Sequence, residues 1–268
     1  SGLNTSAIFG FVNTLQDLLK RETPTHIAVC FDPAGKTFRH EEYPAYKAQR
    51  EATPEDIKLS VPYIKQILDA YNITVCEVPG FEADDVVGTL SRLASERGYQ
   101  TFMVTGDKDF GQLVKPNVKI YNPGKNEILG VAEVNAKYGL ESPLQVIDLL
   151  GLMGDAADNI PGCPGVGPKT AEKLIATYGS IENLLDHTDE LKGSLKQKVS
   201  DNAEQIRLSK HLATIRTDVP IEFDDERFKR VPVDYVKLRE VFSQLEFRTL
   251  TTRIIDHGEA NVGLEGVA

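Results

Sequence analysis

The sequence predicts an α/β fold with a mostly parallel sheet and helices on both faces. In the first half of the chain, short apolar runs alternate with segments in which apolar residues recur at helical spacing. This alternation is typical of parallel sheets, because the chain must cross over the sheet between parallel strands. Strands are expected at residues 26–31, 73–78, 101–105 and 118–121, and helices at 6–20, 54–71 and 82–97.

The second half reads as almost wholly helical. Helices are expected at residues 132–138, 143–152, 168–177, 180–185, 200–214 and 234–242. Periodicity is lost from Thr251 onward. The pattern therefore predicts one domain over residues 1–250, followed by a linker or tail over 251–268.

Composition excludes several classes of protein. The chain has 268 residues, of which 41% are hydrophobic and 26% charged, as in ordinary globular proteins. It contains no apolar run long enough to span a membrane. Its three cysteines, Cys30, Cys76 and Cys163, form no Cys-x-x-Cys pair, so neither a disulfide framework nor a zinc knuckle is expected. The odd count and wide spacing fit a protein of the reducing cytoplasm.

A net charge of −10 argues against nucleic acid as a partner, unless many carboxylates are gathered in one place. Eight acids qualify: six follow predicted strands or open the next helix, and two lie in a loop after an apolar helix. They are Asp32, Glu82, Asp84, Asp85, Asp107, Asp109, Asp155 and Asp158. Without them the net charge would be only −2.

The ligand edge of a parallel sheet lies beyond the carboxyl ends of its strands, where these acids are expected to converge. Carboxylates a few Å apart raise one another's pKa, so such a cluster needs cations to stay ionised. Oxygen ligands suit Mg²⁺ or Mn²⁺. Taken singly, each acid also has an ordinary alternative as a helix cap, a turn residue or a solvated loop residue.

Residues 36–50 interleave cations with aromatic rings, a pattern that suits single-stranded nucleic acid. Arg39, Lys47 and Arg50 are candidates to contact phosphates, and Tyr46 to stack on an unpaired base. The segment has little apolar periodicity, so we expect it to be exposed and mobile. A solvated amphipathic stretch is the alternative.

A glycine-rich turn leads into a helix at residues 162–171. Gly165 and Gly167 permit close approach of a backbone, while Lys169 and Thr170 add donors to the free amides of the helix start. The turn lacks the Gly-x-x-x-x-Gly-Lys-[Ser/Thr] pattern, so a nucleic-acid phosphate fits better than a nucleotide. The alternative is a packing loop between two helices.

Taken together, these segments resemble a known family. The matching residues are Asp32, Phe38-Arg39-His40, Tyr46-Lys47-x-x-Arg50, Phe81-Glu82-Ala83-Asp84-Asp85, Thr105-Gly106-Asp107-Lys108-Asp109, Gly154-Asp155-x-x-Asp158-Asn159-Ile160-Pro161-Gly162 and Gly165-Val166-Gly167-x-Lys169-Thr170-Ala171. Over residues 1–250 they resemble the 5′-nuclease domains of bacterial DNA polymerase I, within the flap endonuclease superfamily.

The resemblance implies a PIN-like sheet, a helical arch at about 36–60 and a helix-three-turn-helix DNA-binding element within about 153–215. It also implies that the eight carboxylates bind two divalent ions, with Asp84 and Asp107 catalytic, and that Lys47 and Arg50 contact the scissile phosphate. The hairpin 162–171 would grip duplex backbone and hold a monovalent cation. The implied substrate is DNA with a 5′ flap or a junction.

By the same resemblance, the chain is expected to act in replication and repair as a monomer in the bacterial cytoplasm, at the nucleoid, joined to a C-terminal polymerase portion. The family's first strand carries another metal-binding Asp, and this chain starts too late to contain it. A catalytically impaired DNA-binding module is therefore one alternative. A Mg²⁺ phosphatase of the haloacid-dehalogenase type is another, since residues 154–159 resemble its acidic motif, although no Asp-x-Asp follows the first predicted strand.

Overall fold

The computed structural model describes residues 2–258, which fall into two compact units. The first unit combines residues 2–31, 52–76 and 224–258. The second combines residues 32–51 and 77–223. No helix in the described residues is both long and apolar enough to cross a membrane.

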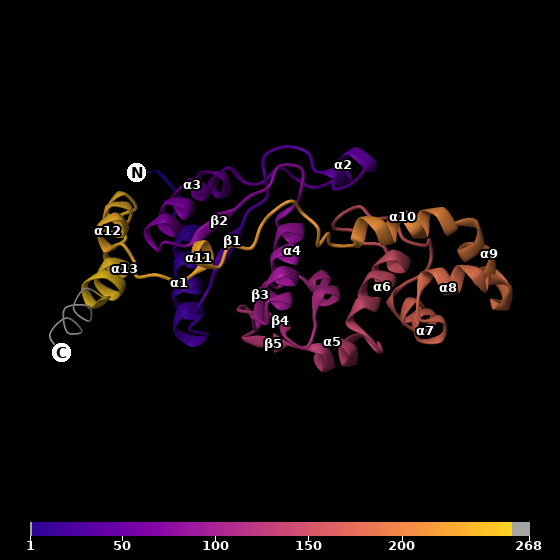
Figure 1. Ribbon diagram of the computed structural model, residues 1–268. Helices are drawn as coiled ribbons and strands as arrows, with labels where there is room; N and C mark the ends of the chain where they lie inside the picture. Colours follow the sequence, from indigo (N-terminus) through magenta and orange to yellow (C-terminus); the bar gives the residue numbers. More distant parts are fainter. Residues whose placement is uncertain (1, 259–268) are drawn as a thin grey trace. The chain divides into compact units, whose positions relative to one another are not determined.

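Figure 1 labels the helices and strands of both units. The first unit contains α1 (Ser6–Arg21), β1 (Ala28–Cys30), α3 (Glu55–Ala70), β2 (Thr74–Cys76), α11 (Asp225–Phe228), α12 (Tyr235–Gln244), α13 (Arg248–Leu250) and a π-helical turn, η4 (Thr251–Asp256). Strands β1 and β2 pair in parallel, with Val29 opposite Val75. Apolar residues at helical spacing on α1, including Ile8, Val12 and Leu15, face the core of this unit, as the sequence predicted.

The predicted tail begins too early. Residues 251–256 form η4, and its Ile254 and Ile255 are buried in the core of the first unit beside Phe242 and Leu250. Two adjacent apolar residues do not produce a recognisable period, which is why the sequence pattern missed this turn. Residues 259–268 of the predicted tail lie outside the described residues.

The second unit contains α2 (Phe38–Glu42), α4 (Ala83–Glu96), β3 (Thr101–Val104), η1 (Lys108–Leu113), β4 (Val118–Asn122), β5 (Glu127–Leu129), α5 (Val131–Tyr138), η2 (Pro143–Gln145), α6 (Val146–Met153), α7 (Pro168–Tyr178), α8 (Ile181–Asp186), η3 (Thr188–Glu190), α9 (Gly193–Asp201) and α10 (Ala203–Ala213). Strands β3 and β4 are parallel, and β5 adds to β4 antiparallel. The expected parallel pairing is thus present in two small sheets of the described residues, one in each unit.

Helix α6 lies at the centre of the helical part of the second unit. Its residues Val146, Leu149, Leu150 and Leu152 are all buried, and it packs along α10 (Figure 1). Apolar side chains around most of a helix are typical of one that is surrounded by others. Helix α9 was not predicted, because Val199 is its one buried residue and its other positions carry too little apolar periodicity.

Candidate active site

The N-terminus of α4 places several of the predicted acids. Glu82 is the residue before the helix, and Asp84 lies in its first turn. Asp32 reaches the same helix end, where its Oδ1 accepts a hydrogen bond of 2.8 Å from the amide of Ala83. Because free amides and the helix dipole make this end positive, carboxylates are stabilised here.

Two further segments of the second unit complete the group. Asp107 follows β3, and its Oδ1 accepts the amide of Asp109 at 2.9 Å, which starts the 3₁₀ turn η1. Asp155 and Asp158 lie in the loop after α6. Seven of the eight predicted acids therefore belong to one connected cluster, here called the carboxylate cluster: Asp32, Glu82, Asp84, Asp107, Asp109, Asp155 and Asp158.

Electrostatics within the carboxylate cluster are unfavourable for two of its members. Burial, followed by repulsion from Asp107, raises the pKa of Asp84 to about 7. The same two causes raise the pKa of Asp109 to about 6. Without added cations, these two carboxylates hold their protons well above the ordinary range for aspartate.

The raised pKa of Asp84 predicts how stability responds to pH. In the folded state Asp84 binds its proton up to about pH 7 but in the unfolded state only to about pH 4, so its contribution to stability is lost as pH rises between these values. Asp84→Asn, which mimics the protonated form, should stabilise the metal-free protein by about 2–4 kcal/mol at pH 8 and hardly at all at pH 4.

Urea unfolding in chelator at both pH values would test this prediction. Asp218→Asn is the matched control, because Arg216 lowers the pKa of exposed Asp218 and its replacement should bring no gain. A gain for Asp84→Asn at pH 4 as large as at pH 8 would contradict an electrostatic origin.

Basic side chains pair with three of the other members of the cluster, Glu82, Asp155 and Asp158. Lys47 forms an ion pair with Glu82 and lies 3.9 Å from an oxygen of Asp158, and Arg50 also pairs with Asp158. Lys108 contacts Asp155 at 2.8 Å and Asp109 at 3.5 Å. Burial opposes ionisation of Glu82, but Lys47 and Arg39 outweigh it and lower its pKa.

Within residues 2–258, no three acids, cysteines or histidines converge closely enough to hold a metal ion as the structure stands. Lysine and arginine side chains instead lie against oxygens of Glu82, Asp155 and Asp158. The sequence analysis did not predict that Lys108 pairs with acids of this cluster, although its position between Asp107 and Asp109 could have suggested it.

Residues 43–51 lie against the loop 155–159. The backbone amide of Lys47 donates to the carbonyl of Asp158 at 2.9 Å, and the Asn159 side chain donates to the carbonyl of Ala45. The ring of Tyr46 is buried, and its hydroxyl donates to Glu82 at 2.9 Å. The segment therefore packs against the carboxylate cluster, and the ring of Tyr46 is not available for stacking in this conformation.

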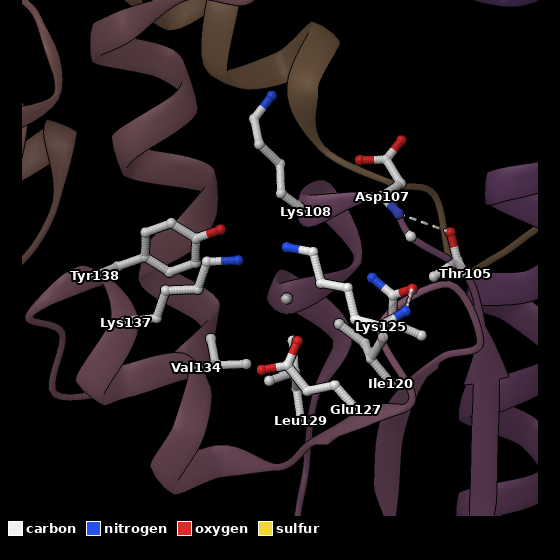
Figure 2. Close-up of a pocket in the computed structure, with 13 residues that line it drawn as sticks. Thr105, Asp107, Lys108, Ile120, Lys125, Glu127, Leu129, Val134, Lys137 and Tyr138 are labelled. Carbon is white, nitrogen blue, oxygen red and sulfur yellow. Dashed lines mark hydrogen bonds between the residues drawn. The ribbon is translucent and has the colours of Figure 1, made fainter.

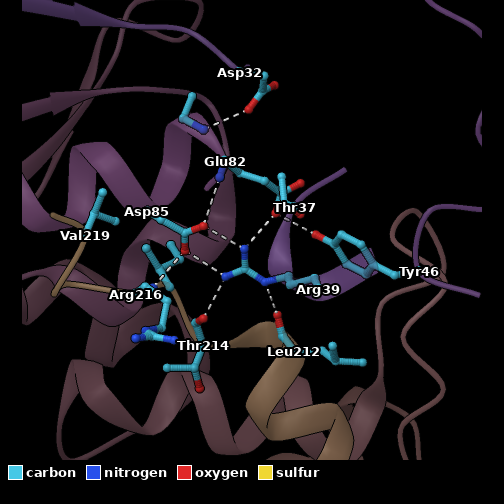
Figure 3. Close-up of polar contacts among 12 residues, drawn as sticks. Asp32, Thr37, Arg39, Tyr46, Glu82, Asp85, Leu212, Thr214, Arg216 and Val219 are labelled. Atoms are coloured by element: carbon cyan, nitrogen blue, oxygen red, sulfur yellow. Dashed lines mark hydrogen bonds and ion pairs between the residues drawn. The ribbon is translucent and has the colours of Figure 1, made fainter. Parts of the chain in front are cut away.

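Arg39 and Asp85 lie elsewhere than the sequence suggested. They form a buried, two-pronged ion pair, with Arg39 3% and Asp85 0% exposed (Figure 3). Every donor of this guanidinium and both oxygens of this carboxylate already have partners within the protein, which leaves none for a phosphate or a metal ion in this conformation. The predicted contact of Arg39 with DNA and the predicted ligand role of Asp85 are corrected to an internal ion pair.

A small cavity of about 40 Å³ borders Asp107. Figure 2 shows Lys125 and Lys137 extending toward this space, whereas Lys108 points away from it. These two ammonium groups, which the sequence analysis did not single out, add positive charge beside a predicted metal ligand.

The hairpin 162–171 has positive φ at Gly165, as expected, whereas Gly167 is extended with φ of −93°. Gly162 and Gly165 have φ of +62° and +76°, a region that favours glycine, and Pro168 begins α7. Lys169 and Gly167 are exposed, and Thr170 is half-buried. The Lys198 side chain of α9 lies beside Gly165, where it adds a cation to the hairpin; without a prediction of α9, nothing in the sequence pointed to it.

Comparison with solved structures identifies the fold. The T5 5′-exonuclease with bound zinc matches with a TM-score of 0.66 and 24% identity, covering 78% of this chain and 81% of that one. The catalytic core of Rad2 in complex with DNA matches with a TM-score of 0.57 and 21% identity, covering 90% of this chain and 80% of that one. The predicted PIN-like α/β fold is thereby confirmed.

Relatives in sequence are DNA polymerases. DNA polymerase I of Bacillus subtilis (strain 168) is 41% identical over 258 residues, and that of Mycobacterium bovis is 40% identical over 263. These alignments cover 94% and 95% of this chain but only 29% and 28% of the relatives, so the chain spans less than a third of their length.

Two family models match consecutive parts of the chain. Residues 1–139 match the 5′-3′ exonuclease N-terminal resolvase-like domain, and residues 141–236 match the 5′-3′ exonuclease C-terminal SAM fold. The order of the two models is the order in which the acidic segments and the hairpin occur along the sequence. The chain therefore belongs to the 5′-3′ exonuclease family.

Proposed function

We propose that the chain hydrolyses DNA phosphodiesters at 5′ flaps and 5′ ends, with two divalent ions, Mg²⁺ or Mn²⁺, held by the carboxylate cluster. The observation that carries this proposal is that seven electrostatically linked acids lie in one cluster, with Lys47 and Arg50 paired to two of them. A cluster of acids alone would suit a metal-binding site, and a cluster of basic residues alone would suit a phosphate-binding site. Their combination suits cleavage of a phosphodiester.

The donor set fits divalent ions. Oxygen Oδ1 of Asp109 is buried without a hydrogen bond, with the Lys108 ammonium 3.5 Å away, and burial beside other carboxylates raises the pKa of Asp84. A hard cation would satisfy both, because it supplies positive charge to oxygen ligands. When bound, such ions supply an activated water and stabilise charge on the attacking and leaving oxygens.

The chain's own residues have separate roles in this proposal. Asp32, Glu82, Asp84, Asp107, Asp109, Asp155 and Asp158 hold the ions, some directly and some through water. Lys47 and Arg50, which pair with Glu82 and Asp158 in this structure, would neutralise the scissile phosphate. Tyr46 stacks on an unpaired base only if residues 43–51 leave the conformation described above.

Duplex binding is assigned to the hairpin 162–171. Gly165 and Gly167 let a DNA backbone approach, and Lys169 and Thr170 donate to phosphate oxygens beside the start of α7. A monovalent cation held by hairpin carbonyls would add a further positive charge. Lys198 beside Gly165, and Lys125 and Lys137 at the cavity that borders Asp107, are further cations that could neutralise DNA phosphates.

Lys169→Ala should weaken binding to all duplex sequences alike and lower the slope of log affinity against log salt by about one unit, because one phosphate contact is lost. Binding would be measured in Ca²⁺ at several salt concentrations. Lys229→Ala, which removes a cation of the first unit, should leave the slope unchanged. A loss restricted to particular sequences would indicate base recognition instead.

A 5′-labelled flap substrate tests the function directly. Cleavage is expected with Mg²⁺ or Mn²⁺ and not with chelator. Release of phosphate from small esters without flap cleavage would favour the phosphatase, and DNA retention without cleavage would favour the binding module. We further propose that the active protein is monomeric, works at DNA in the bacterial cytoplasm and continues into a polymerase portion, as its relatives' length suggests.

A further inference from the structure

The guanidinium of Arg39 is a junction between three parts of the second unit. All five of its N–H groups have an acceptor at 2.8 Å (Figure 3). Nε donates to the carbonyl of Leu212, Nη1 to Glu82 and Asp85, and Nη2 to Asp85 and the carbonyl of Thr214. No donor of this side chain is left over.

Asp85 is equally saturated. Its Oδ1 accepts from Arg39 and from the amide of Arg216, both at 2.8 Å. Its Oδ2 accepts from Arg39 at 2.8 Å and from the amide of Glu82 at 3.1 Å. A carboxylate has about four acceptor positions, so Asp85 fixes Arg39 and the start of α4 and has none to spare.

The two carbonyls that Arg39 binds lie at the C-terminal end of α10. Helix ends leave carbonyls without partners and carry partial negative charge, which a buried guanidinium satisfies. The same helix holds the hairpin: the Gln205 side chain donates to the carbonyl of Gly162 at 2.8 Å, and the amide of Gly162 donates to Ser209 at 2.9 Å.

On its other side, Arg39 holds the carboxylate cluster. The oxygen of Glu82 that accepts from Arg39 also accepts from Tyr46, and the second oxygen pairs with Lys47. A continuous series of hydrogen bonds thus runs from Gly162 of the hairpin through α10 to Arg39 and on to Glu82. All of these residues belong to the second unit.

We propose that Arg39 is a positioning residue that sets the distance between the hairpin and the carboxylate cluster, and thereby selects which phosphodiester is cut. This inference rests on the proposed function. If the hairpin grips duplex backbone, the spacing from hairpin to Glu82 measures a fixed length of DNA. An ion pair with Asp85 alone would join Arg39 only to α4, whereas its contacts with Leu212, Thr214 and Glu82 join it to α10 and to the carboxylate cluster as well.

Arg39→Lys separates these roles, since lysine keeps the charge but has three donors on one atom and cannot span all the acceptors. Cleavage of a 5′ flap would be resolved to single nucleotides under single-turnover conditions. We expect the fraction of product cut at neighbouring positions to rise at least about tenfold, because a displacement of about 1 Å at the reacting atoms can change a reaction rate about 10²-fold. Duplex affinity in Ca²⁺ should change less than about twofold, because no phosphate contact is removed.

Arg92→Lys is the matched control. Arg92 also extends from α4 to the segment after α10, where its Nε donates to the carbonyl of Thr217 at 2.8 Å, but its acid partner is Glu96 rather than Glu82. Its product distribution should equal that of the unmodified chain. Ser209→Ala, which removes one of the two hydrogen bonds between α10 and Gly162 without touching Arg39, should shift the cut positions in the same direction as Arg39→Lys.

A measurement independent of cleavage uses amide hydrogen exchange in Ca²⁺. Duplex binding should protect the amides of residues 82–86 in the unmodified chain and in Arg92→Lys, but not in Arg39→Lys. Unchanged cut positions in both Arg39→Lys and Ser209→Ala, or protection that survives Arg39→Lys, would overturn the proposal. If the unmodified chain bound duplex but cut no flap, the proposed function would fail, and exchange would still decide the role of Arg39.

Discussion

Asp107→Ala should lower the single-turnover rate of flap cleavage by about 10³-fold, with the protein still folded. A metal ion contributes several kcal/mol to transition-state stabilisation, and a loss of about 4 kcal/mol corresponds to three orders of magnitude. Asp107 lies close enough to two buried acids, Asp84 and Asp109, for its charge to raise their pKa values. This central position in the cluster is the reason to expect so large an effect.

A second signature distinguishes a metal ligand from a structural acid. Without Asp107, the pKa values of Asp84 and Asp109 should fall toward the ordinary range, and the metal-free protein should become more stable at neutral pH. Glu96→Ala, at the far end of α4 and paired with Arg92, should alter neither rate nor stability beyond a few tenths of a kcal/mol. An Asp107→Ala variant that cuts at the normal rate would exclude Asp107 from the site.

Lys47→Ala should lower the cleavage rate by about 10²–10³-fold, because a cation aimed at developing negative charge acts mainly in the transition state. Duplex affinity in Ca²⁺ should change little, since the loss concerns turnover rather than the duplex grip. Single-turnover cleavage and binding of the same flap substrate would be measured side by side. Raised pH or additional Mg²⁺ should restore the rate only in part.

The structure adds a second expectation for Lys47. Its ammonium group forms an ion pair with Glu82 and lies near Asp158, two residues that are proposed to bind a divalent ion. Lys47→Ala should therefore bind Ca²⁺ more tightly while cutting more slowly, a combination that loss of folding does not produce. Lys36→Ala removes an exposed cation of the same segment and should change neither quantity. Equal losses of rate and duplex affinity in Lys47→Ala would remove it from the catalytic group.

Local sequence determined the fold class and the assembly of most acids. Strand-length apolar runs and helical periods were enough to predict β1 to β4 and α1, α4 and α7, because burial imposes those periods on the sequence. Acids that follow strands or begin helices then lie close enough to interact, as Asp32, Asp84 and Asp107 do. The hairpin was equally readable, since positive φ at Gly165 and proline at the start of α7 are local requirements.

Tertiary structure decided what neighbouring residues do. Asp84 and Asp85 look alike in sequence, but adjacent residues of a helix point about 100° apart. One faces the carboxylate cluster, whereas the other is buried against Arg39. Arg39 and Tyr46 lie in a segment that reads as exposed, yet both are buried, because their partners Leu212, Thr214 and Asp158 are more than a hundred residues away. A local sequence pattern cannot reveal partners so far apart along the chain. Only the packing of α4, α10 and the loop 155–159 brings them together.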